Sequence, residues 1–134
     1  MIKGIDHVGI AVKSIDEAKK FWVDTLGLKL LRIEAVPEQK VRVAILQADK
    51  TTIELLEPTS PDSPIQRFLE RRGEGLHHLT LETDNLAERL KKLKAANVGL
   101  IDEQPRVGAG GTKIAFLHPK SAHGVLVELC EPHE

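Results

Sequence analysis

The stretch IDHVGIAVKSIDEA, Ile5 to Ala18, returns past the middle of the chain as LHHLTLETDNLAER, Leu76 to Arg89. At one constant offset, His7 falls on His78, and the polar residues that follow also match. A repeat of this length indicates that one structural unit occurs twice.

A second echo closes each half of the chain: IELLEP, Ile53 to Pro58, against VELCEP, Val127 to Pro132. It aligns Glu54 with Glu128 in their final strands, and in the same register it aligns Glu57 with Glu131 and Pro58 with Pro132. Two His and two Glu therefore stand at matched places in the two copies.

Each copy reads as β-α-β-β-β. Residues 5–12 alternate between two faces, Ser14 with Glu17 opens a helix, and Gly27 ends it. In the second copy Asn85 with Glu88 repeats the cap, and Gly99 ends the helix. The expected strands are Ile5–Val12, Leu28–Ile33, Val41–Gln47, Thr51–Glu57, Leu76–Thr83, Leu100–Val107, Lys113–His118 and Gly124–Cys130.

These patterns predict an α+β fold in one domain over residues 1–134. Its parts are a module over 1–58, a connector over 59–75 with a short helix from Ser63 through Arg71, and a module over 76–134. Neither module has enough core alone, so the two are expected to pack together around a concave sheet. Pairing within one chain and pairing between two chains both remain open.

Strand alternation sorts the candidate ligands by face. Glu54 lies opposite Ile53 and Leu55, and Glu128 lies opposite Val127 and Leu129. His7 and His78 likewise oppose the more apolar face of their strands; His77, the competitor of His78, lies on the apolar side with Leu79 and Leu81.

The four residues His7, Glu54, His78 and Glu128 are predicted to bind a divalent metal ion. Two imidazoles and two carboxylates suit Co, Mn, Ni, Fe or Zn, and such an ion acts as a Lewis acid on substrate oxygen. The alternative is that the four face water and that the repeat merely copied them. Their matched register and face favour the metal site.

Composition excludes several classes of function. The 134 residues carry 19 Lys and Arg against 20 Asp and Glu, which offers no broad basic face for nucleic acid or for a membrane surface. Aromatic residues are 3% and Tyr is absent. The single Cys130 excludes an internal disulfide, and no apolar run is long enough to span a bilayer, so a soluble cytoplasmic protein is expected.

Two further features can be interpreted either as purely structural or as functional. Gly108, Gly110 and Gly111 form either a hairpin turn or a loop that lets backbone approach a ligand. Cys130 is interpreted as packing, because nothing nearby would activate its thiolate.

The stretches IDHVGIAV, IELLEP, EGLHHLTLETDN, GAGGTKIAFLHPKS and GVLVEL resemble the methylmalonyl-CoA epimerase family of the vicinal oxygen chelate superfamily. The resemblance spans nearly the whole chain. It implies an enzyme with a metal, cobalt first, bound by His7, His78 and Glu128, with Glu54 at the fourth position. It also implies methylmalonyl-CoA as substrate and a homodimer.

Epimerisation at C2 of such a substrate needs an acid or base on each face of the carbon. Glu128 and Glu54 are the expected catalytic carboxylates, with Glu128 serving one face. Some relatives carry the second carboxylate on the strand that here reads VRVAILQ, Val41 to Gln47, and lacks one. Glu38, Glu54 and a metal-bound water are the candidates for the other face.

Three rival functions share this fold. A glyoxalase I-type lyase would use the same metal frame but should bind glutathione, for which no distinctive pattern is present. An extradiol dioxygenase is disfavoured by the absence of Tyr. A non-enzymatic ligand-binding or resistance protein would usually lack the full His and Glu set.

Overall fold

The computed structural model describes residues 1–132, which form two compact units. The first unit is His7–His77, and the second joins Met1–Asp6 to the chain from His78 onward. Strands β1 (Ile2–Ala11) and β5 (Gly75–Thr83) each contribute residues to both units.

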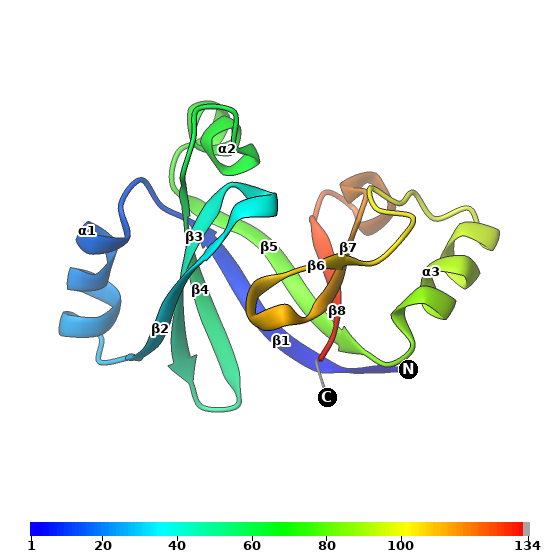
Figure 1. Cartoon of the computed structure of the whole chain (residues 1–134), viewed down its shortest axis with the longest axis horizontal. Helices are drawn as coiled ribbons and strands as arrows, with labels where there is room; N and C mark the ends of the chain where they lie inside the picture. The colour runs from blue at the N-terminus through cyan, green and yellow to red at the C-terminus, as the bar shows by residue number, and fades with distance from the viewer. Residues whose placement is uncertain (133–134) are drawn as a thin grey trace. The chain divides into compact units, whose positions relative to one another are not determined.

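In the first unit, the strands lie in the order β2-β3-β4-β1, with β1 parallel to β4 and the other neighbours antiparallel (Figure 1). Helix α1 packs its Ile15 into a core formed with the buried residues Val12, Ala44, Leu46 and Leu55. The elements besides β1 are α1 (Ile15–Lys19), the π-helical turn η1 (Lys20–Thr25), β2 (Lys29–Val36), the 3₁₀ turn η2 (Pro37–Gln39), β3 (Val41–Ala48), β4 (Thr51–Pro58) and α2 (Pro64–Arg72).

The second unit repeats this plan in the order β5-β8-β7-β6, with β5 parallel to β8. Its core is Leu86 and Leu90 of α3 against Ala115 and Leu129. The elements besides β5 are α3 (Leu86–Ala95), β6 (Arg106–Val107), the 3₁₀ turns η3 (Ala109–Gly111) and η4 (Pro119–Ala122), β7 (Lys113–Leu117) and β8 (Val127–Glu131). The predicted α+β fold class is confirmed.

The strand predicted over Leu100–Val107 is formed only in part. Leu100 makes a bridge to Leu117, and the two residues of β6 pair with β7, but no continuous strand joins them. The Asp102 carboxylate accepts the Phe116 backbone N–H at 2.9 Å, and Pro105 has no N–H to give. The Asp102 side chain therefore accepts a hydrogen bond that a backbone carbonyl of a neighbouring strand would otherwise accept.

The predicted helix boundaries hold in part. Ser14 caps α1 by accepting the Glu17 N–H at 3.2 Å, as expected, but the helix widens after Lys19 into the π-helical turn. Asn85 stands at the N-cap position of α3 as predicted, but its side chain makes no cap hydrogen bond. The end of α3 is marked by Asn97, whose φ of 64° is left-handed, ahead of Gly99.

The second glutamate of each repeated motif, IELLEP or VELCEP, caps the helix of its own unit. Glu57 accepts the Ile15 N–H at 2.8 Å, and Glu131 accepts the Leu86 N–H at 2.9 Å. Each carboxylate thus satisfies a backbone donor at the positive end of its helix. This part of the repeat is explained by structure and not by a site.

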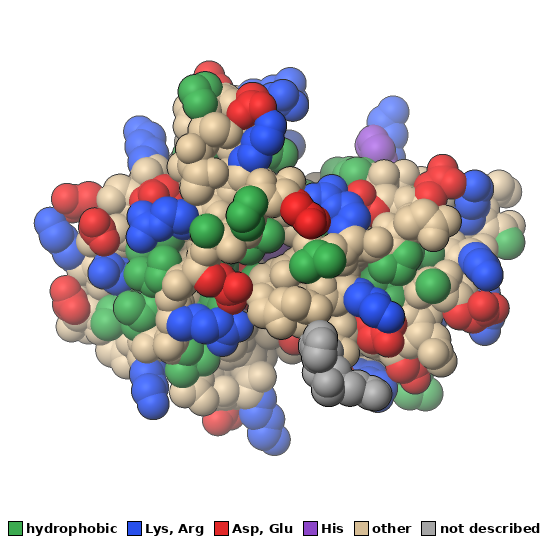
Figure 2. All heavy atoms as spheres, viewed as in Figure 1, with side chains coloured by type: hydrophobic (Ala, Val, Ile, Leu, Met, Phe, Trp, Pro, Cys, Tyr) green, Lys and Arg blue, Asp and Glu red, His purple; other side chains and the backbone are tan. Residues whose placement is uncertain are grey.

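Acidic and basic side chains are intermingled over the face shown in Figure 2. Among residues 1–132, no helix combines the length and the apolar character needed to cross a bilayer.

Replacing Glu131 by Gln should lower the free energy of unfolding by about 1 kcal/mol, because a charged acceptor at a helix start is lost. Urea unfolding followed by circular dichroism measures this. Glu88→Gln, at an exposed position in the same first turn, is the matched control and should cost less. Equal costs for the two variants would contradict the capping role of Glu131.

Candidate metal centre

In the first unit, His7 of β1 and Glu54 of β4 form a buried pair. Their residues are 6% and 8% exposed, and Nδ1 of His7 lies 3.3 Å from Oε2 of Glu54. Glu54 alternates with Ile53 and Leu55, which pack in the helix-covered core. The pair therefore occupies the opposite face of the sheet, as predicted.

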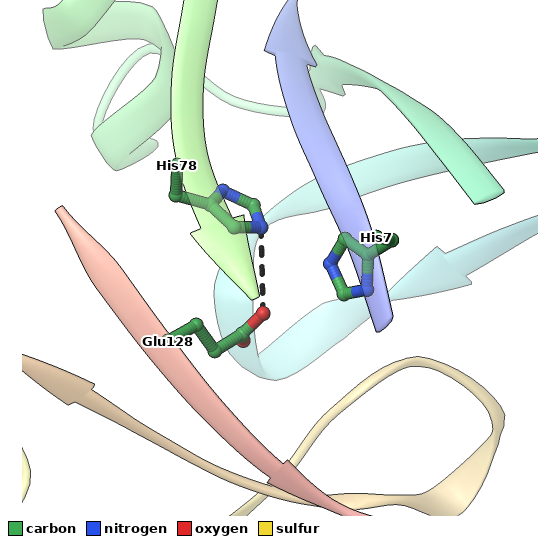
Figure 3. A group of neighbouring side chains, drawn as sticks. All are labelled: His7, His78 and Glu128. Carbon is green, nitrogen blue, oxygen red and sulfur yellow. Dashed lines mark ion pairs between the residues drawn. The ribbon is translucent and has the colours of Figure 1, made fainter. Parts of the chain in front are cut away.

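In the second unit, His78 of β5 and Glu128 of β8 form the equivalent pair, with Nε2 of His78 3.3 Å from Oε1 of Glu128 (Figure 3). They are 8% and 4% exposed. The hydroxyl of buried Thr80 donates to Glu128 at 2.5 Å, and Phe116 meets the His78 ring edge-on at 5.6 Å. Burial of all four side chains contradicts the interpretation that they face water.

The two pairs differ in a way that the repeat does not predict. Glu128 lies beside Thr80 in the register, whereas Glu54 lies beside Gly9, which has no hydroxyl to donate. His7 faces its glutamate through Nδ1, and His78 through Nε2. The two carboxylates therefore have different surroundings and are free to take different roles.

His7, His78 and Glu128 each offer a ligand atom, and these atoms lie within 4.8 Å of one another (Figure 3). Glu54, the fourth predicted ligand, is not part of that group, and its carboxylate lies beside the His7 ring. A carboxylate on a ring nitrogen of a ligating histidine sets the orientation and basicity of the ring. Glu54 is thus placed either to bind the metal ion itself or to orient the His7 ring.

The donor set fits a divalent cation. Two neutral imidazoles and two ionised carboxylates carry a charge of about −2, which a divalent ion neutralises. Buried carboxylates are costly without such compensation. Mixed nitrogen and oxygen donors suit Co, Mn, Ni, Zn or Fe.

The structure places His77 apart from this group. Its ring packs edge-on against Phe68 of α2, with centroids 5.0 Å apart. The choice of His78 over His77, made from strand alternation, agrees with this placement.

The glycine-rich stretch is the turn that joins β6 to β7, as the hairpin-turn interpretation predicted. A Cβ at Gly108 would come within 2.7 Å of Cγ2 of Ile114, and Gly110 has a φ of 70°. Cys130 is buried. Its burial raises the pKa of its thiol, and the nearby Asp6 carboxylate raises it further. It is a packing residue in this fold.

Residues that sequence reasoning missed include Thr80 and Phe116, which contact the second pair. The signal for Thr80 was its place on the His78 side of the alternation. Glu38, a sequence candidate for the second acid or base, is exposed in η2.

Known proteins are similar to this chain in sequence and in fold. Residues 6–116 match the Glyoxalase/Bleomycin resistance protein/Dioxygenase superfamily. The chain is 52% identical to uncharacterized protein YqjC of Bacillus subtilis, covering 96% of this chain and 91% of that protein. It is 37% identical to human mitochondrial methylmalonyl-CoA epimerase, covering 93% and 72%. A methylmalonyl-CoA epimerase solved in complex with methylmalonyl-CoA and NH4+ is 35% identical, with a TM-score of 0.93 and coverage of 98% and 95%.

His78→Ala should abolish binding of one Co²⁺ per chain, whereas His77→Ala should leave it largely intact, because only the His78 side chain joins the buried group. Isothermal titration calorimetry of the metal-free protein measures this, with circular dichroism to verify folding. Equal loss in the two variants would contradict the assignment of His78.

Proposed function

This chain belongs to the methylmalonyl-CoA epimerase family of the glyoxalase superfamily, and on that premise we propose that it interconverts (2R)- and (2S)-methylmalonyl-CoA. The observation that carries the proposal is the buried group of His7, His78 and Glu128. Such a group combines a place for a cation with a carboxylate able to move a proton.

The reaction needs both features. C2 of methylmalonyl-CoA lies between a thioester and a carboxylate, so its proton is acidic and its removal leaves an enolate. We propose that His7, His78 and Glu128, with Glu54 at the fourth position, hold a divalent ion, cobalt first among Co, Mn, Ni, Zn and Fe. When bound, that ion supplies positive charge that stabilises negative charge developing on substrate oxygen.

Glu128 is the proposed base for one face of C2. Its carboxylate is held by the Thr80 hydroxyl at 2.5 Å and lies 3.3 Å from His78, so its orientation is constrained before substrate arrives. Removing the proton breaks the C2–H bond and forms an O–H bond on the carboxylate, while the electron pair passes into the enolate. Glu54, the other carboxylate expected to take part in catalysis, is proposed to assist by keeping the His7 ring in place.

The assembly is proposed to be one domain over residues 1–134, with modules over 1–58 and 76–134 and a connector over 59–75, acting as a cytoplasmic homodimer. The free thiol of buried Cys130 is compatible with a reducing compartment. Sedimentation at several protein concentrations would test the dimer.

The test of the function is proton NMR of methylmalonyl-CoA in D₂O with the protein stripped of metal and then reloaded with Co²⁺. We expect metal-dependent exchange of the C2 proton with interconversion of the epimers. No exchange by verified cobalt-loaded protein would refute the function, and a glyoxalase I-type activity on the glutathione hemithioacetal would then be assayed.

Glu128→Gln should lower kcat about 100-fold or more while changing KM less, because general acid–base help of this kind contributes about 10²–10⁴-fold. The assay is run at saturating Co²⁺ to separate catalysis from loss of metal. An unchanged kcat would remove Glu128 from the proposed role.

A further inference from the structure

Epimerisation requires an acid or base for each face of C2, and Glu128 provides only one. Strand β3 (Val41–Ala48) carries no carboxylate. The structure offers a candidate on its neighbour β2, and the inference below rests on the proposed function.

Strand β2 contains an irregularity that decides which way its side chains point. It pairs antiparallel with β3, but the register shifts between Leu30, which pairs with Leu46, and Arg32, which pairs with Ile45. Leu31 is therefore skipped, as in a β-bulge. Bulges reverse the alternation beyond them and are common next to active sites.

The apolar residues of β2 verify this reversal. Leu30 and Ile33 both pack against the core cluster that contains Ala44 and Leu46, although they are three residues apart. Simple alternation would put residues three apart on opposite faces. Because Ile33 faces the helix-covered core, Glu34 faces the other side of the sheet.

That other side is the face of His7 and Glu54. In the register, Glu34 pairs with Val43, and Val43 pairs with Leu56, two residues beyond Glu54 on β4. Two strand spacings of about 4.8 Å put Glu34 on the order of 10 Å from Leu56 at the backbone. The register thus places the Glu34 side chain on the same face of the sheet as Glu54, one residue pair further along.

The Glu34 carboxylate is also oriented. Nε of Arg32, on the same face, donates to Oε1 of Glu34 at 3.0 Å. The Glu34 side chain is 28% exposed, against 53% for Arg32, so the carboxylate is the more sheltered partner of the two. Glu38, the other glutamate of this region, is exposed in η2.

We infer that Glu34 is the second acid/base, acting with Glu128. In one direction, the Glu34 carboxylate takes the C2 proton of one epimer, and the C–H electron pair enters the enolate. Protonated Glu128 then gives its proton to C2, which yields the other epimer. The two carboxylates have exchanged protonation states, and the reverse turnover or exchange with water resets them.

Glu34→Gln tests this role, because it keeps the size and hydrogen-bonding reach of the side chain but cannot take a proton. Each epimer is incubated separately in D₂O with the cobalt-loaded variant and followed by NMR. We expect interconversion to fall at least about 100-fold. Exchange of the C2 proton should survive for the one epimer that Glu128 deprotonates, without inversion.

Glu38→Gln is the matched control and should behave as the wild-type protein. Glu34→Asp keeps a carboxylate and should interconvert the epimers faster than Glu34→Gln, which also guards against a folding effect. Wild-type interconversion by Glu34→Gln, or equal loss of exchange from both epimers, would overturn the assignment while leaving the proposed function standing. A wild-type protein inactive on both epimers would overturn the function itself.

Discussion

The structure depends on placing two imidazoles and two carboxylates in dry surroundings without leaving charge unbalanced. Glu54 and Glu128 are both below one-tenth exposed, and each lies 3.3 Å from a histidine ring nitrogen. An isolated ionised carboxylate in such a place would cost several kcal/mol. A divalent ion would compensate this cost, so the site couples metal binding to the stability of the strands that carry it.

The repeated unit supplies this site through two separate devices. The first glutamate of each closing motif, Glu54 or Glu128, pairs with a histidine, and the second, Glu57 or Glu131, caps the helix of its own unit. The helix is thereby tied to the strand whose opposite face carries the site. The two units differ beside these glutamates. Gly9 lies beside Glu54, whereas Thr80 lies beside Glu128 and donates its hydroxyl to that carboxylate.

Much of this was accessible from the sequence, because period-two alternation and a repeat are strong signals. They placed His78 rather than His77 with the glutamates, and they located seven of the strands to within a few residues. The metal ligation itself and the catalytic roles stay predictions.

Other features depend on tertiary contacts that alternation does not encode. The repeated plan of the two halves suggests a strand after Leu100, but Asp102 accepts the hydrogen bond of the Phe116 backbone N–H. The bulge at Leu31 is visible only in the register with β3, and without it Glu34 would be assigned to the face of Leu30. A sequence argument that extends alternation through a bulge puts every later side chain on the wrong face.

We propose that the matched residues of the two repeats hold one divalent ion. Anomalous X-ray scattering at the cobalt edge from crystals of Co²⁺-loaded protein tests it most directly. We expect one strong peak per chain at bonding distance, about 2.0–2.3 Å, from His7, His78 and Glu128. A cobalt peak coordinated by other residues, or none at these three in protein shown to be saturated, would contradict it.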